Sequence, residues 1–197
     1  MSSYTVVLTP HPETYREVVY GIEARVCWTE SGALALTYAL KGDITRLRLP
    51  PPRPPRRADR LWQHTCFESF VAVKGEPAYH EFNFAPSGEW AAYKFQRYRD
   101  GTPLEEEKIA AGITVRIAGD TLELGALIRL HGVTGLQRRG QLRLGLSAVV
   151  EDDQGMLSYW ALKHPAGKPD FHHPDAFALE LGPPTLQAAN ELPVEKR

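Results

Sequence analysis

Residues 61–70 read LWQHTCFESF, and the rest of the chain is organised around this stretch. If it is a strand, its period of two places on one face the side chains of Trp62, His64, Cys66, Glu68 and Phe70. An unpaired buried carboxylate costs several kcal/mol, so Glu68 on such a face needs a cation, hydrogen-bond donors or a ligand. Two interpretations stay open: a nearby arginine neutralises Glu68, or Glu68 binds a polar ligand that stacks on Trp62.

The composition is that of a globular domain, and its net charge is too small to indicate a nucleic-acid-binding surface. A length of 197 residues with 43% hydrophobic content is enough for a sizeable core, so we expect one domain over residues 1–182 and a polar tail over 183–197. A net charge of −1 predicts no nucleic-acid partner. No apolar run approaches the roughly 20 residues that span a bilayer, and no leader precedes the first strand, so we expect no membrane partner and a cytoplasmic location. The oligomeric state stays open.

Apolar residues alternate with polar ones in short runs between turn signals, which is typical of β-strands. Residues 22–28 and 34–40 read as a hairpin, and residues 4–8 read as an edge strand that prolines close. Further strands are expected at 61–70, 79–84, 89–98, 113–117, 122–130, 142–150, 156–162 and 176–181. Only residues 105–111 have helical propensity. The pattern predicts an all-β fold, an antiparallel β-sandwich of the immunoglobulin-like or jelly-roll kind.

Five prolines and four arginines fill residues 47–59, between the hairpin and the opening stretch. Proline at that density excludes a helix or a central strand, so we expect an extended surface loop that acts as a stiff connector.

A second polar face is expected on the strand at 79–84, where Tyr79, Glu81 and Asn83 alternate with His80 and aromatic residues. A carboxylate and an amide in line are suited to binding hydroxyl groups, although the face could equally be only solvated. Later in the chain Gly145 and Ser147 are small residues on one strand face, and they would leave space for a ligand.

The loop at 163–175 contains residues of the types that bind metals: His164, Asp170, His172 and His173. These four are weak metal candidates, because adjacent histidines cannot easily aim at one ion. A structural loop held by its prolines is the favoured interpretation, with Phe171 packed. No cofactor is expected.

Four motifs together resemble the DOMON-like bacterial proteins, which are related to family 9 carbohydrate-binding modules. They are LW…CFE at 61–68, YHEFNFAPSG at 79–88, SYWAL at 158–162 and PDFHHPDAF at 169–177. The resemblance covers residues 4–182 and implies a sandwich with a ligand site on one sheet. It implies that Trp62 and Trp160 enclose a sugar, that Glu68 is the carboxylate beside them, and that Arg97 or Arg99 is the basic group.

Three functions follow from these observations. The leading one is a non-catalytic binding domain for a carbohydrate or other small polar ligand, at one concave site where Trp62, Glu68 and Trp160 meet. Its candidate binding residues are Trp62, Glu68, Trp160, Glu81, Asn83, Arg99 and Ser147. The first alternative is a hydrolase that acts on a sugar with Glu68 and Glu81 as its acid/base pair. The second is a haem- or metal-binding DOMON domain, with Met156 or Met1 as the axial haem ligand.

Overall fold

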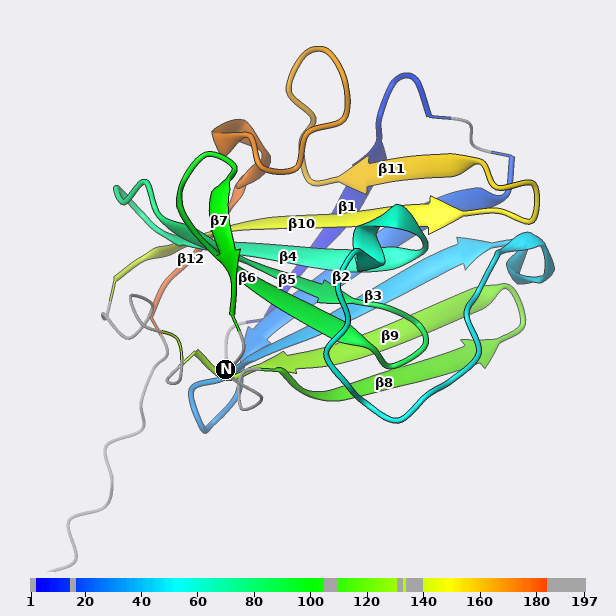
Figure 1. The fold of residues 1–197 in the computed structure, drawn as a ribbon, viewed down its shortest axis with the longest axis horizontal. Helices are drawn as coiled ribbons and strands as arrows, with labels where there is room; N and C mark the ends of the chain where they lie inside the picture. Colours follow the sequence, from blue (N-terminus) through cyan, green and yellow to red (C-terminus); the bar gives the residue numbers. More distant parts are fainter. Residues whose placement is uncertain (1–2, 15–16, 105–109, 131–132, 134–139, 184–197) are drawn as a thin grey trace, which may run out of the picture.

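A computed structural model describes residues 3–14, 17–104, 110–130, 133 and 140–183 of the chain. Two layers of antiparallel strands face one another across a single large core (Figure 1). The first layer has the strand order β8-β9-β3-β2-β1 and the second has the order β7-β6-β5-β4-β10-β11. Within these ranges the helical elements are short 3₁₀ turns, and none is long and apolar enough to cross a membrane. The predicted antiparallel β-sandwich is confirmed.

Consecutive strands of the first layer pair along most of their length. Its members are β1 (Ser3–Pro10), β2 (Val19–Trp28), β3 (Leu34–Gly42), β8 (Ala110–Ala118) and β9 (Thr121–Ile128). The predicted hairpin is β2 and β3, with Ala24 opposite Tyr38 in its register. Alternate residues of β3 are buried, as expected of a layer with one face on the core.

The second layer contains β4 (Cys66–Val73), β5 (Tyr79–Phe84), β6 (Trp90–Arg97), β7 (Asp100–Pro103), β10 (Leu142–Glu151), β11 (Leu157–Ala161) and β12 (Leu179–Leu181). β10 is its centre: one edge pairs with β4, and the other pairs with β12 and then with β11. Every residue of β5 is buried, and only the last residue of β4 is partly exposed. Both faces of these strands are therefore covered, one by the first layer and one by loops.

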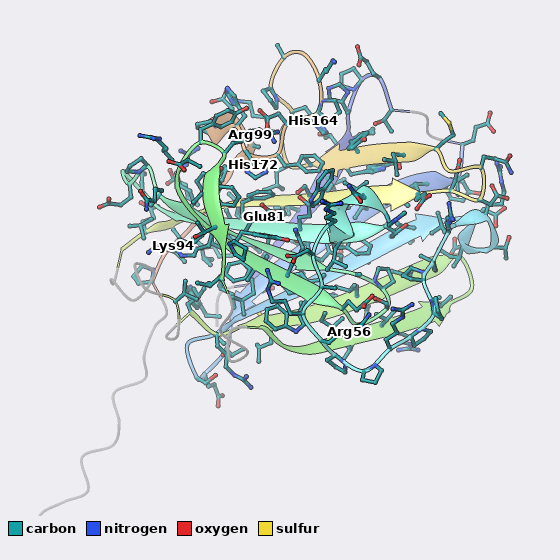
Figure 2. All side chains as sticks on the ribbon, viewed as in Figure 1. Arg56, Glu81, Lys94, Arg99, His164 and His172 are labelled. Atoms are coloured by element: carbon teal, nitrogen blue, oxygen red, sulfur yellow. The ribbon has the colours of Figure 1, made fainter. Side chains whose placement is uncertain are left out.

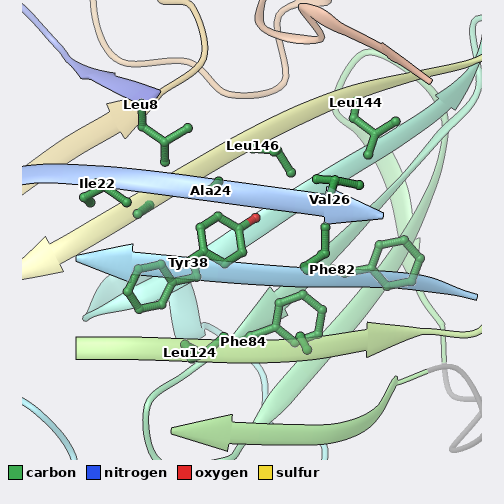
Figure 3. Close-up of a cluster of buried hydrophobic side chains, with 14 of the residues drawn as sticks. Leu8, Ile22, Ala24, Val26, Tyr38, Phe82, Phe84, Leu124, Leu144 and Leu146 are labelled. Carbon is green, nitrogen blue, oxygen red and sulfur yellow. The ribbon is translucent and has the colours of Figure 1, made fainter. Parts of the chain in front are cut away.

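Tyr38 connects the two layers through the core (Figure 3). Its side chain is fully buried, its ring centroid lies 5.1 Å from that of Phe67, and its hydroxyl donates a 2.7 Å hydrogen bond to the backbone oxygen of Glu68. Burial is the main reason that the pKa of Tyr38 lies well above its usual value. The hydroxyl therefore stays protonated and fixes the position of β4 at the residue that carries the candidate carboxylate.

We expect Tyr38→Phe to lower the free energy of unfolding by about 1 kcal/mol, because the carbonyl of Glu68 loses a buried donor. Chemical denaturation would measure this loss. Tyr20→Phe is the matched control, since Tyr20 is 66% exposed on β2 and should be unaffected. Equal stability of Tyr38→Phe and the native chain would contradict a structural role for the hydrogen bond.

Two strand predictions and one helix prediction need comment. Residues 61–65 are not a strand: Leu61–Gln63 form a 3₁₀ turn, η2, and β4 begins at Cys66. β1 is not at an edge, because it lies between β2 and β11, and Pro10 pairs with Trp160 at the end of the strand. Of the predicted helix at 105–111, residues 105–109 lie outside the described residues, and the last two begin β8.

The connector at 47–59 is extended, as predicted. Single bridges attach it to the second layer, from Leu47 to Asp152 and from Arg57 to Trp90. It delivers the chain to Arg60, which adopts the left-handed conformation (φ 62°) and turns the chain into η2. The predicted tail lies outside the described residues from residue 184 onward.

Candidate functional site

A cavity of about 690 Å³ opens on the outer face of the second layer, opposite the core. Its floor comes from β4, β5, β6, β10 and β11, and its rim comes from η2 and the loop at 163–175. This volume lies within the range of about 300–1,000 Å³ that is usual for small-molecule sites. The loops that cover the outer face therefore enclose a space large enough for a small ligand.

Two carboxyl groups from neighbouring strands line this cavity. Glu68 on β4 is opposite Asn83 on β5, and Glu81 is two residues along β5, opposite Phe70. Residues two apart share a face of a strand, so the side chains of Glu68, Glu81 and Asn83 point the same way. Glu68 is 3% exposed and Glu81 is 5% exposed. The predicted polar face of residues 79–83 is thus present, and it is covered rather than solvated.

Burial raises the pKa of both carboxyl groups. It places the pKa of Glu68 well above its usual value, and the nearby charge of Glu81 raises it further. Burial also raises the pKa of Glu81 to about 7, against the lowering effects of a hydrogen bond from Asn83 and the charge of Arg99. The two buried carboxyl groups therefore disfavour carrying two negative charges together near neutral pH.

Trp62 provides an open aromatic surface at the rim. It lies in η2, lines the cavity and is 50% exposed. Tyr93, Tyr159 and Phe171 also line the cavity, and the rings of Tyr159 and Phe171 lie 6.3 Å apart. Aromatic faces beside buried carboxyl groups are suited to a ligand that has both an apolar face and polar edges.

One wall of the cavity is a connected set of side chains around His172 and Arg99 (Figure 2). The guanidinium of Arg99 donates a 2.8 Å hydrogen bond to Asp170, which also accepts one from the hydroxyl of Tyr98. His172 packs edge-on against Phe70, and its Nδ1 lies 2.9 Å from the hydroxyl of Tyr79. Its Nε2 lies 3.7 Å from Glu81. Burial lowers the pKa of His172 to about 4, so the imidazole is neutral above that pH.

Trp160 does not belong to this site, and the prediction that Trp62, Glu68 and Trp160 meet at one concave surface is wrong. Trp160 is 2% exposed within the core, on the opposite face of the second layer, and its indole N–H donates to Ser158. The neighbouring residue Tyr159 points to the other face and lines the cavity. One residue along a strand is enough to exchange the two faces.

The space beside Gly145 is also filled. A Cβ there would lie 3.3 Å from the backbone oxygen of Ala176, so this position accommodates the turn η4 (Pro174–Ala176) rather than a ligand. Ser147 is opposite Glu68 on β10 and is 2% exposed, and its hydroxyl has no hydrogen-bond partner within the described chain. Ser147 and Asn83 thus lie beneath the floor and not at its surface.

Three arginines that could neutralise Glu68, namely Arg97, Arg99 and Arg143, have partners elsewhere. Arg97 pairs with Asp100, Arg99 pairs with Asp170, and Arg143 donates to the backbone oxygens of Pro174 and Phe177. Among the residues that the structure describes, no cationic side chain lies within 4.0 Å of Glu68. The interpretation of Glu68 as half of a buried arginine pair is therefore wrong.

The four weak metal candidates have separate contacts. His164 bonds the backbone oxygen of Thr9, Asp170 pairs with Arg99, His172 bonds Tyr79, and His173 accepts the backbone N–H of Asp175. Over the described ranges, no three His, Cys, Asp or Glu side chains gather where they could hold a metal ion. Phe171 packs against a second apolar cluster, as predicted for this loop.

Sequence reasoning missed Tyr93, Tyr159, Phe95 and Lys168 as residues that line the cavity. Tyr93 had a readable signal, because it is opposite Glu81 on the next strand and so shares its face. Tyr159 is opposite Val149 on β10, so it shares a face with another residue that lines the cavity. No sequence pattern predicts that Lys168 lines the cavity, because its position depends on the path of a loop.

Comparison with known proteins supports the fold. No family model matches the chain, and no curated protein is similar enough in sequence to match. A crystal structure of a candidate carbohydrate-binding protein from Bacteroides uniformis superposes with a TM-score of 0.61 at 16% identity, covering 87% of this chain and 83% of the other.

Two structures of a family 9 carbohydrate-binding module from Caldicellulosiruptor kristjanssonii are also similar. The module in complex with cellotriose has a TM-score of 0.52 at 11% identity, covering 83% of this chain and 74% of the module. The module in complex with glucose has a TM-score of 0.50 at 10% identity, covering 83% and 76%. The chain therefore shares the fold of family 9 carbohydrate-binding modules, as the resemblance implied, whereas the DOMON relationship stays a prediction.

Proposed function

We propose that this protein is a non-catalytic binding domain for a carbohydrate, which it holds in the cavity of the second layer. The observation that carries the proposal is a half-exposed indole, Trp62, at the rim of a cavity whose floor presents two carboxyl groups, Glu68 and Glu81. A pyranose has an apolar face of C–H groups and a periphery of hydroxyls. The indole matches the first, and the carboxyl groups match the second.

The similar structures support a sugar as the ligand. Two of them are modules in complex with cellotriose and glucose, and they share this fold. The aromatic partners differ from those that the resemblance implied, because Trp160 is in the core. Tyr159, Tyr93 and Phe171 are among the aromatic side chains that line the cavity with Trp62, and we assign the stacking surface to these four.

We expect Trp62→Ala to weaken the binding of the best saccharide by at least about tenfold. A tryptophan side chain presents about 250 Å², so covering one face of a half-exposed indole removes about 60 Å² from water, or about 1.5 kcal/mol. Isothermal titration calorimetry against a panel that includes glucose, cellobiose and cellotriose would measure the effect.

Tyr20→Ala is the matched control, because Tyr20 is an exposed aromatic residue on the first layer and lies away from the cavity. Its affinity should equal that of the native chain. Absence of binding to every saccharide at millimolar concentration would overturn the proposed function. Binding that Trp62→Ala leaves unchanged would place the sugar elsewhere.

Hydrolysis of a sugar is the second candidate, because Glu68 and Glu81 line one cavity and burial raises the pKa of both carboxyl groups. A protonated acid beside an ionised carboxylate is the arrangement that glycosidases use. Incubation with aryl glycosides separates the two functions. A pure binding domain releases no phenol, whereas a hydrolase releases it in the native chain and loses the activity in Glu68→Gln.

A further inference from the structure

The floor of the cavity contains two carboxyl groups that no cationic side chain of the described residues binds. Glu68 and Glu81 are both at least nine-tenths buried and point to the same space. Glu68 has no hydrogen-bond or ion-pair partner for its carboxyl group within the described chain. Glu81 accepts one 2.7 Å hydrogen bond from Asn83 and has His172 at 3.7 Å. Buried carboxylates that lack partners require donors from another source.

Cations near the cavity do not supply these donors. His172 is neutral at physiological pH, and Arg99 bonds Asp170 and Tyr98. Lys168 lines the cavity, but it is an exposed residue, and the structure places no carboxylate within 4.0 Å of its ammonium among the described residues. The titratable and charged groups around Glu81 are thus Cys66, Glu68, Tyr79, Tyr93, Arg99, Lys168, Asp170 and His172. None of them is a cation that binds the floor.

Two further acceptors without partners lie beneath the floor, outside the set of residues that line the cavity. Asn83 is fully buried and donates its amide N–H to Glu81. Its Oδ1 has no hydrogen-bond partner among the described residues. The hydroxyl of Ser147 is also buried and unpaired, directly across from Glu68. The polar groups that Glu68 and Glu81 present at the floor are carboxyl oxygens. An ammonium group has three donors and no acceptor, and it therefore fits two carboxyl groups better than a hydroxyl, which has one donor.

We propose that the cavity takes a ligand with a protonated amino group, an amino sugar as the class of carbohydrate, with its ammonium held between Glu68 and Glu81. The identification of the ligand as a sugar rests on the proposed function, but recognition of the ammonium does not. Calcium fits less well, because it needs six to eight oxygen ligands and the described residues provide no cluster of three or more acidic or histidine side chains.

The carboxyl pair gives this recognition a pH dependence. Burial raises the pKa of both groups, that of Glu81 to about 7, and the charge of Glu81 raises the pKa of Glu68 further, so the free floor disfavours two negative charges near neutral pH. An ammonium between them favours the ionised form of both groups, and binding therefore releases a proton. Affinity should rise from pH 5.5 to pH 7.5, as long as the amine stays protonated. A neutral sugar would release no proton when it binds, and its affinity would not rise over this pH range.

Calorimetric titration of the full chain with glucosamine, glucose and putrescine at pH 5.5 and 7.5 tests the proposal. We expect glucosamine to bind at least about tenfold more tightly than glucose at pH 7.5. Glucosamine itself should bind less tightly at pH 5.5 than at pH 7.5. Glu68→Gln should weaken the binding of glucosamine by at least about tenfold and the binding of glucose by less than about threefold. Glu123→Gln is the control, since this carboxylate is exposed on the first layer and should change nothing.

Each outcome separates the ammonium proposal from the carbohydrate function. Glucose binding as tightly as glucosamine, or equal losses for both sugars in Glu68→Gln, would overturn the proposal and leave a sugar site. Binding of putrescine that depends on Glu68, with neither sugar bound, would support ammonium recognition and remove the carbohydrate function. If none of the three probes binds, both proposals fail.

Discussion

Trp160→Ala is expected to lower the free energy of unfolding by about 3–5 kcal/mol, because it removes a large side chain from a close-packed core. Trp160 is 2% exposed, packs in the cluster between the two layers, and lies on β11 where that strand meets both β10 and β1. Its N–H to Ser158 hydrogen bond is lost as well. Denaturation by guanidinium at neutral pH, followed by circular dichroism, would measure the change.

Trp62→Ala is the matched comparison, since both variants remove an indole, in this case from the turn η2. Trp62 keeps half of its surface in water, so its loss should lower stability by no more than about 1 kcal/mol. A variant of Trp160 that stays as stable as Trp62→Ala would show that the indole is not packed in the core. It would then restore Trp160 as a candidate for stacking on a ligand.

The assignment of faces shows how far the sequence could predict this site. Tyr79, Glu81 and Asn83 were placed together by alternation alone, and they share the outer face of β5. The same alternation puts Trp160 and Ser158 on one face of β11, where the indole N–H donates to the Ser158 hydroxyl. It could not tell which face of β11 pointed inward, because both faces contain large apolar side chains, Leu157 and Tyr159 on one and Trp160 on the other.

The rim of the cavity depends on contacts between distant segments, which a strand period cannot predict. Trp62 reaches the cavity because the chain turns at Arg60 in a left-handed conformation and forms η2 over β4 and β5. That conformation is uncommon for a residue other than glycine, and nothing in the local sequence marks it. Reading residues 61–65 as the start of a strand placed Trp62 in the right region for the wrong reason.

Arginine neutralisation of Glu68 was a reasonable expectation on energetic grounds. A buried carboxylate needs compensation, and the chain has arginines on the neighbouring strands. In the structure those arginines bind Asp100, Asp170 and backbone carbonyls, and the carboxyl pair keeps a proton instead. Protonation is an alternative to ion pairing that a sequence does not display, because it depends on the depth of burial.

Glu81→Gln is expected to stabilise the protein by about 3 kcal/mol at pH 8 and to have little effect near pH 4.5. The pKa of Glu81 is raised from an ordinary value of 4.5 to about 7. A carboxyl group of that kind contributes stability below its unfolded pKa and loses it as the pH rises through the folded pKa. A shift of about 2.5 units at 1.36 kcal/mol per unit corresponds to about 3 kcal/mol. The Gln oxygen can still accept the N–H of Asn83.

Unfolding free energies of both proteins, measured by denaturant at intervals from pH 4.5 to 8, would give this difference directly. Burial lowers the pKa of His80 to about 4, so His80 favours folding at higher pH and opposes the trend in each protein. Because His80 is present in both, its contribution cancels when the variant is compared with the native chain. The difference between the two curves should therefore rise steadily between about pH 4.5 and 7 and then level off.

Glu89→Gln is the control with the opposite sign. Hydrogen bonds from Arg56 hold the pKa of Glu89 below its usual value, so its ionised form stabilises the fold. Removing that charge should destabilise the protein at pH 8 and have a smaller effect as the pH falls towards the folded pKa of Glu89. If Glu81→Gln behaved like Glu89→Gln, the carboxylate of Glu81 would have a cationic partner in the folded protein. The cavity floor would then already be neutralised, and it would not need a ligand with an ammonium group.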